Sequence, residues 1–137
     1  MHNPSNTVTE SKSMLWTGRV LGGLATLFLL ADSLAKFAKP QVVLEGTVKL
    51  GYQENVIIPL GAVLLISTLL YAVPRTAVLG AILLTGYLGG AVATHVRVND
   101  PLFSHSLFPV YMGVMLWLGL YLTDARLRAL LPLRSRG

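Results

Sequence analysis

Residues 55–96, NVIIPLGAVLLISTLLYAVPRTAVLGAILLTGYLGGAVATHV, contain two long apolar runs that are separated by Pro74 and Arg75. Arg75 is the only Asp, Glu, Lys or Arg residue in this stretch. A helix of about 20 apolar residues crosses the ~30 Å hydrocarbon core of a bilayer, and each run approaches that length. Because the linker is so short, the sequence predicts two antiparallel transmembrane helices that are neighbours.

Further apolar segments lie on both sides of this pair. The first ends before Lys39 and Pro40, because proline disfavours helical geometry in the residue that precedes it. We predict an all-α, integral membrane four-helix bundle in one domain over residues 14–123, with spans at 14–37, 55–73, 76–96 and 105–122. Residues 41–54 are too short and too charged to span, so we expect an amphipathic segment on the membrane surface or folded back into the bundle.

The composition supports a membrane protein and excludes several other classes. Of the 137 residues, 53% are hydrophobic and 12% are charged, whereas soluble domains carry about 25% charged residues. The chain has no cysteine, which excludes thiol redox chemistry and thiolate metal sites. The net charge of +5 is dispersed, so we expect contact with anionic lipid in the bilayer and no nucleic-acid partner.

Polar segments are predicted at both ends of the chain. Residues 1–13 are expected to form a disordered cytoplasmic tail, and residues 124–137 a basic cytoplasmic tail. A secretory signal peptide is an alternative for the first segment, because Arg19 precedes an apolar run. The acidic Glu10 and the continuation of the helical pattern to Phe37 favour a transmembrane span.

The distribution of basic residues predicts the orientation in the bacterial inner (cytoplasmic) membrane. Basic residues near span ends prefer the cytoplasm. With four spans, the side that holds both termini carries seven of them: Lys12, Arg19, Arg75, Arg126, Arg128, Arg134 and Arg136. The opposite side carries only four: Lys36, Lys39, Lys49 and Arg97. Both termini are therefore expected to be cytoplasmic.

Asp32 and Lys36 are the first candidate site residues. They lie four residues apart near the outer end of the first span, a spacing at which an acid and a base on a helix form a favourable ion pair. One interpretation is a polar site that contacts a substrate or a proton. The other is an interfacial pair in which Lys36 extends to water, although Asp32 lies deeper than this explains.

His95 and Arg97 are expected at the same membrane level, at the outer end of the third span. Two residues correspond to about 200° around a helix, so one side chain should face the bundle and the other the headgroups or the loop. Asp32 paired with His95 or Arg97 is a plausible interhelical contact. Asp32, Lys36, His95 and Arg97 form the candidate polar pocket, with an ordinary polar cap as the alternative.

A metal or haem site is not predicted. His95 and His105 are not spaced as metal ligands on one helix face, and no carboxylate motif accompanies them. Both lie near the outer surface, whereas membrane haem is usually held by histidines buried in facing helices. No catalytic residue can be named from the sequence.

Two pairs of glycines indicate close helix packing. Gly18 and Gly22 lie on one stripe of the first span, and Gly86 and Gly90 on one stripe of the third. Such stripes let helix backbones approach closely, either within the bundle or between copies of the chain.

Residues 74–98, PRTAVLGAILLTGYLGGAVATHVRV, resemble the DoxX-like family of small bacterial membrane proteins. Further features that resemble the family are the stretch from Gly22 through Asp32 to Lys36, the break at Pro40, and the motifs Leu50-Gly51-Tyr52, Pro101-Leu102-Phe103, Phe108-Pro109 and Arg126-Leu127-Arg128. The resemblance covers residues 16–133 and implies a four-helix membrane bundle. The family takes its name from a subunit associated with thiosulfate:quinone oxidoreductase, and most of its members have no assigned activity.

These observations lead to three expectations about function. The first is a non-catalytic partner or subunit in the membrane, in a quinone-dependent redox assembly or as a homo-oligomer, with quinone contact but no resident cofactor. The second is a small-solute transporter or small-molecule-binding protein that uses the outer polar pocket. The third is direct quinone chemistry, with His95 and Asp32 or Arg97 as hydrogen-bond partners and an electron donor supplied by another protein.

Overall fold

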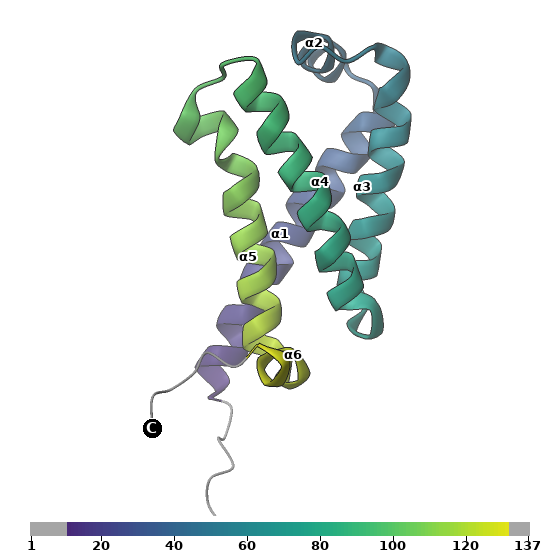
Figure 1. The fold of residues 1–137 in the computed structure, drawn as a ribbon. Helices are drawn as coiled ribbons and strands as arrows, with labels where there is room; N and C mark the ends of the chain where they lie inside the picture. The colour runs from purple at the N-terminus through teal and green to yellow at the C-terminus, as the bar shows by residue number, and fades with distance from the viewer. Residues whose placement is uncertain (1–10, 132–137) are drawn as a thin grey trace, which may run out of the picture.

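The computed structural model describes residues 11–131, and every regular element among them is helical. The four long helices are α1 (Lys12–Ala38), α3 (Ile57–Ala72), α4 (Ala77–Arg97) and α5 (Phe108–Thr123) (Figure 1). Three short helical turns precede α3, α4 and α5: η1 (Glu54–Val56), η2 (Pro74–Thr76) and η3 (Leu102–Ser106). With these turns, all four helices are long and apolar enough to cross a membrane. The predicted all-α, four-helix membrane bundle is therefore confirmed.

Local sequence signals explain where α1 begins and ends. The side chain of Ser11 accepts a hydrogen bond from the backbone N–H of Met14 (3.1 Å), which satisfies a donor that the first turn leaves free. At the other end Lys39 adopts a left-handed conformation (φ 50°), and Pro40 prevents the helix from continuing. The chain then forms the short helix α2 (Gln41–Lys49), which has no buried residue.

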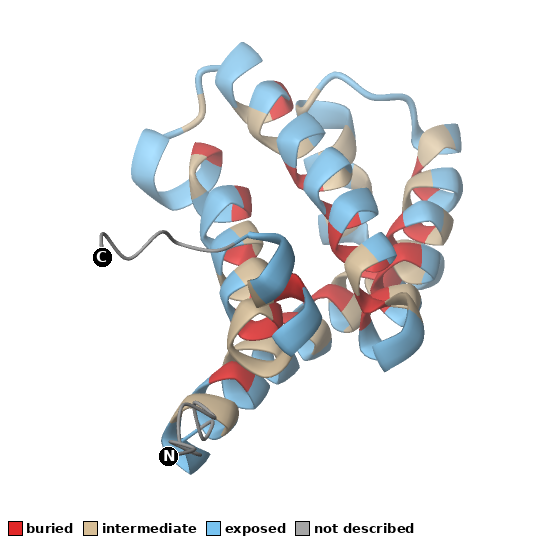
Figure 2. Ribbon diagram, turned by 60° about the horizontal axis from the view of Figure 1, so that its bottom comes forward, coloured by how far each residue is buried: buried red, intermediate tan, exposed pale blue. Residues whose placement is uncertain are grey.

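The helices pack in a closed order: α1 and α4 each contact both α3 and α5. The core contains small and branched side chains from all four, among them Ala25, Leu64, Leu84 and Leu116. Figure 2 shows the buried residues on the inner sides of the helices and exposed residues on the outer sides. Many exposed side chains are large and apolar, which suits a surface that faces lipid.

The predicted packing glycines behave in two different ways. Gly18 and Gly22 lie where α1 meets α5, and a Cβ added at Gly18 would come within 2.7 Å of the Thr123 Cγ2 atom. On α4, a Cβ at Gly86 or Gly90 would meet no atom of the described chain within 4 Å. Within the described residues no helix packs closely against Gly86 or Gly90, because both glycines border the cavity described below. Close approach between copies of the chain stays a prediction.

Two further glycines, which were not predicted as packing residues, also lie at close helix contacts. Gly119 of α5 faces the backbone of Gly18 and Gly22, and a Cβ there would lie 2.8 Å from the Gly22 nitrogen. Gly80 of α4 lies so close to α3 that a Cβ would overlap the backbone of Tyr71.

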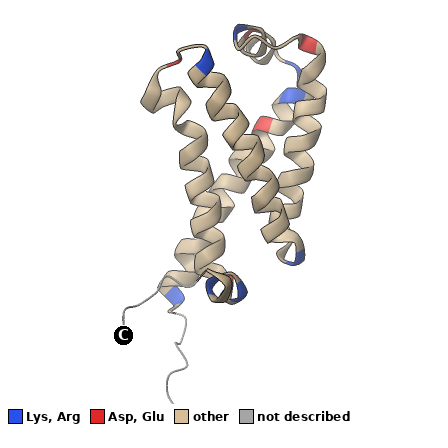
Figure 3. Cartoon of the chain, in the orientation of Figure 1, with Lys and Arg blue, Asp and Glu red and all other residues tan. Residues whose placement is uncertain are grey.

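The two ends of the bundle differ in what they carry. The start of α1, the turn between α3 and α4, and the short helix α6 (Ala125–Leu130) share one end, which we call the α6 end (Figure 1). Helix α2 and the connection 98–107 lie at the other, the α2 end. Charged residues concentrate at both ends (Figure 3). Residues 1–10 of the predicted N-terminal tail and 132–137 of the predicted basic tail lie outside the described residues.

Helix α6 occupies part of the segment that was predicted as a basic tail. The carboxylate of Asp124 caps it by accepting hydrogen bonds from the backbone N–H groups of Arg126 (2.9 Å) and Leu127 (3.3 Å). Leu127 is buried against the core, so this segment is part of the fold.

Candidate functional site

A cavity of about 680 Å³ lies at the α2 end, between α1, α4 and α5 and beneath α2. Its volume falls in the range typical of small-molecule sites, about 300–1,000 Å³. The deeper part is apolar and is lined by Phe28, Leu29, Leu60, Leu88, Phe108 and Met112. The end toward α2 carries the ionisable side chains, which we call the polar rim: Asp32, Lys36, Lys49, His95, Asp100 and His105.

Asp32 and Lys36 form the first ion pair of the polar rim. The Lys36 Nζ atom lies 2.7 Å from the Asp32 Oδ1 atom, as their spacing on one helix face predicts. The Lys36 side chain is 16% exposed and that of Asp32 is 38% exposed. The Asp32 carboxylate is thus the more accessible member, and it remains able to accept a hydrogen bond inside the cavity.

His95 and Asp100 form the second pair of the polar rim, 2.6 Å apart from Nδ1 to Oδ2. The contact forms because the chain reverses at Asn99, which adopts a left-handed conformation (φ 57°), and the Asp100 N–H then donates to the His95 carbonyl (3.1 Å). The hydrogen bond from His95 holds the pKa of Asp100 below its usual range against the opposing effect of burial, and the Lys49 charge acts in the same direction as the hydrogen bond.

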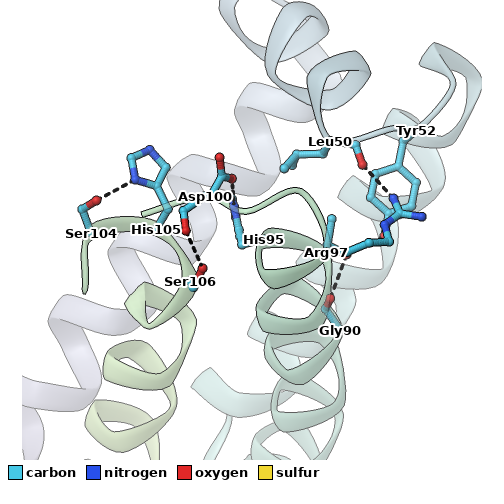
Figure 4. Close-up of polar contacts among 10 residues, drawn as sticks. Leu50, Tyr52, Gly90, His95, Arg97, Asp100, Ser104, His105 and Ser106 are labelled. Carbon is cyan, nitrogen blue, oxygen red and sulfur yellow. Dashed lines mark hydrogen bonds and ion pairs between the residues drawn. The ribbon is translucent and has the colours of Figure 1, made fainter. Parts of the chain in front are cut away.

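His105 completes the rim on the α5 side. Its ring lies edge-on to that of His95, with centroids 6.1 Å apart, and its Nδ1 atom is 2.8 Å from the Ser104 hydroxyl (Figure 4). The Ser106 hydroxyl donates to the Asp100 carbonyl (3.3 Å) and steadies the same turn. Among residues 11–131, no three His, Asp or Glu side chains come together as a metal site would require.

The segment after α2 is fastened to the end of α4 by two contacts (Figure 4). The Arg97 guanidinium donates to the Leu50 carbonyl (2.8 Å), and the hydroxyls of Tyr52 and Thr94 are 2.8 Å apart. Gly51 lies between them with φ 88°, a conformation that glycine adopts without strain. These contacts hold α2 over the cavity.

Three of the four predicted site residues line the cavity: Asp32, Lys36 and His95. Arg97 lies outside it and fastens the chain after α2. The expected interhelical contact of Asp32 with His95 or Arg97 is replaced by Asp32 with Lys36 and His95 with Asp100. Both pairs form between residues close in sequence. Asp32 and Lys36 are four residues apart on one helix, and the turn at Asn99 brings Asp100 back to His95.

Several cavity residues were not predicted from the sequence. Lys49 and Tyr52 reach the cavity from the α2 segment, and Phe28 and Phe108 contribute part of its apolar wall. The two phenyl rings meet edge to face, with centroids 5.2 Å apart, although 80 residues separate them in the sequence. Nothing in the sequence indicates that contact, whereas the small residues Gly86 and Gly90 did stand out and were assigned to packing.

The four apolar helices, their lipid-facing surfaces and the cavity at one end define a small multi-pass membrane protein. A model of the DoxX-like family matches residues 20–119, which include most of α1, all of α2 to α4 and most of α5. The chain therefore belongs to the DoxX-like family. The comparisons with curated proteins and with solved structures gave no match.

Proposed function

We propose that this DoxX-like protein is a non-catalytic, small-molecule-binding component of the cytoplasmic membrane. The observation that carries the proposal is the cavity, in which an apolar wall within the helices meets a polar rim at the α2 end. Such a cavity suits an amphipathic molecule whose tail contacts the apolar wall and whose head accepts and donates hydrogen bonds at the rim. A quinone with a short alkyl chain has such a tail and a head that accepts hydrogen bonds, and its reduced form, the quinol, also donates them.

The polar rim supports binding of a head group without net charge. Its two carboxylates, Asp32 and Asp100, are matched by the two ammonium groups of Lys36 and Lys49. A charged head group would upset that balance in a site of low dielectric constant, where an unpaired charge is costly. His95 is proposed to donate to a carbonyl of the quinone and Asp32 to accept from a hydroxyl of the quinol, while Lys36 and Asp100 hold them in position.

A role as a partner or subunit of a quinone-linked redox assembly follows from this proposal. Four side chains of the rim are held in two pairs, Asp32 with Lys36 and His95 with Asp100, which suits holding a ligand in place. Electron transfer would be the task of another protein in the assembly. The exposed apolar surfaces of the helices offer area for such a membrane partner or for a second copy of the chain.

The proposed location includes an orientation, with the α6 end and both termini in the cytoplasm. The basic side chains Arg19, Arg75, Arg126 and Arg128 lie at or near the α6 end, and basic residues near span ends prefer the cytoplasm. In this orientation the polar rim lies near the outer surface of the membrane.

Equilibrium binding of a benzoquinone that carries a decyl chain tests the proposal. The full chain is placed in lipid nanodiscs, and the bound tritium-labelled quinone is measured against empty nanodiscs. Gly90→Leu adds a side chain to open space in the cavity, so we expect it to raise the Kd about tenfold or more by filling the site. Gly23→Leu is the matched control, because Gly23 also has open space around it but does not line the cavity. Equal affinity in both variants, or no binding above empty nanodiscs, would contradict the proposal.

Transport of a small solute is a second candidate, favoured by the six ionisable side chains of the polar rim. It predicts solute flux into liposomes that contain the protein, and flux lost in Gly90→Leu but kept in Gly23→Leu. Saturable quinone binding without flux across a broad panel of small solutes would favour the binding role.

A further inference from the structure

A second hollow lies on the outer side of the bundle, in the surface formed by α4 and α5. It has a volume of about 340 Å³, and we call it the α4–α5 groove. Gly89 and Gly113 leave it open, and Val110, Val114 and Trp117 border it. Its lining is almost entirely apolar, and it lies within the two spans Pro74–Arg97 and Leu102–Thr123. The medium in contact with this groove is therefore the hydrocarbon of the bilayer.

The groove and the cavity are separated by a thin wall. Leu88 and Pro109 line both hollows, so their side chains have the cavity on one side and the groove on the other. A Cβ placed on Gly113 would lie 3.9 Å from the Cδ1 atom of Leu88, in ordinary contact, so no larger side chain reinforces the wall there. Of these two residues only Leu88 has a flexible side chain that can change its rotamer, so it is the movable part of the wall.

The route from water into the cavity passes helix α2. Helix α2 lies over the polar rim, and two contacts fasten the chain that follows it: Arg97 to the Leu50 carbonyl, and Tyr52 to Thr94. Two polar contacts must therefore break before α2 can move away. At the groove, one polar contact joins the helices, from the Trp117 indole N–H to the Thr85 hydroxyl (2.7 Å), and it lies in the groove lining and outside the cavity.

We propose that the α4–α5 groove is a lateral portal through which the ligand moves between the bilayer and the cavity, with Leu88 as its gate. This inference rests on the proposed binding function and defines its ligand further as a molecule dissolved in the membrane. The tail of the ligand passes between Gly89 and Gly113, where the absence of side chains leaves room, and the head then reaches the polar rim.

The kinetics of exchange distinguish a portal from a merely structural groove. Gly89→Leu and Gly113→Leu each narrow the groove, and neither residue lines the cavity. For decylbenzoquinone in nanodiscs we expect both uptake and release to slow by about tenfold, because the ligand must then pass a leucine side chain where the groove was open. The Kd stays unchanged, since both rates fall by the same factor. Gly23→Leu again serves as the control and leaves both rates unchanged.

The outcomes separate this inference from the proposed function. Binding that persists with unchanged exchange rates in Gly89→Leu and Gly113→Leu would overturn the portal and leave the binding function intact. Loss of equilibrium binding in the unmodified chain would instead contradict the binding function.

A second measurement tests the portal without any ligand of the cavity. The chain has two tryptophans, so Trp16→Phe leaves Trp117 in the groove as the only fluorophore of this kind. Phospholipids brominated along their acyl chains quench a tryptophan that they contact. We expect strong quenching of Trp117 and weaker quenching in Gly113→Leu, which fills the groove. An unquenched Trp117 would show that the bilayer does not reach the groove and would overturn the portal.

Discussion

At the scale of single residues, hydrogen bonds satisfy the buried polar side chains beside the polar rim. Thr94, buried at the end of α4, donates to the Gly90 carbonyl (2.9 Å) and also meets the Tyr52 hydroxyl. No side-chain nitrogen or oxygen that is buried in the described part of the chain lacks a hydrogen-bond partner. Because a buried polar group without a hydrogen bond is costly, these hydrogen bonds allow polar side chains to lie beside an apolar cavity.

The contact between His95 and Asp100 predicts an acid-dependent loss of stability. The pKa of Asp100 is lower in the folded protein than its ordinary value of 3.8, so its ionised form stabilises the fold. That contribution is fully present above this ordinary value and is lost as the pH falls through the lowered folded value. We expect Asp100→Asn to unfold more easily near neutral pH and to show a weaker dependence on acid.

Thermal unfolding in detergent from about pH 7 down to about pH 3 measures this effect. Glu54→Gln is the control, since Glu54 is an exposed carboxylate at the start of η1. If the Tm of Asp100→Asn changes with pH in parallel with that of the unmodified protein over the whole range, the contact between His95 and Asp100 does not stabilise the fold.

At the scale of elements, close backbone contacts hold α3 against α4 and α1 against α5. The Tyr71 hydroxyl of α3 also donates to the Leu116 carbonyl of α5 (2.7 Å), which links two helices that lie diagonally opposite in the bundle. The α4 glycines illustrate both uses of a small residue. Gly80 allows α3 and α4 to touch, whereas Gly86 and Gly90 leave space for the cavity.

This difference predicts opposite outcomes for two similar substitutions. Gly80→Ala places a methyl group against the Tyr71 backbone, which cannot move aside as a flexible side chain could, so we expect a loss of about 1–3 kcal/mol in the free energy of unfolding. Gly86→Ala meets open space and exchanges glycine for a better helix former, so stability is unchanged or slightly higher. Reversible unfolding in detergent compares the two, and equal losses would contradict the assigned packing.

The four long helices could be predicted from the sequence because lipid imposes length and apolarity on each span. The pairing of Asp32 with Lys36 followed from helical spacing. The partner of His95 did not, because it depends on the left-handed turn at Asn99. The cavity could not be predicted either, because the spacing of Gly86 and Gly90 is the same whether the stripe faces a helix or an empty space.

At the scale of the whole molecule, the proposed orientation can be tested because the chain contains no cysteine. Arg75→Cys marks the α6 end and Asn99→Cys marks the α2 end, and both positions are exposed. With a membrane-impermeant maleimide and intact bacterial spheroplasts, we expect labelling of Asn99→Cys at once and of Arg75→Cys only after lysis. The reverse pattern would place the polar rim on the cytoplasmic side.

If an amphipathic molecule binds inside the bundle, the residues that it contacts can be identified by photo-crosslinking. The probe is a benzoquinone whose alkyl chain carries a photoreactive diazirine, and mass spectrometry locates the adducts on the full chain in nanodiscs. We expect adducts on cavity residues such as Phe28, Leu60 and Met112, which disappear when unlabelled decylbenzoquinone is added in excess. Adducts spread over outward-facing residues such as Leu27 and Ile66, with no competition by the unlabelled quinone, would contradict it.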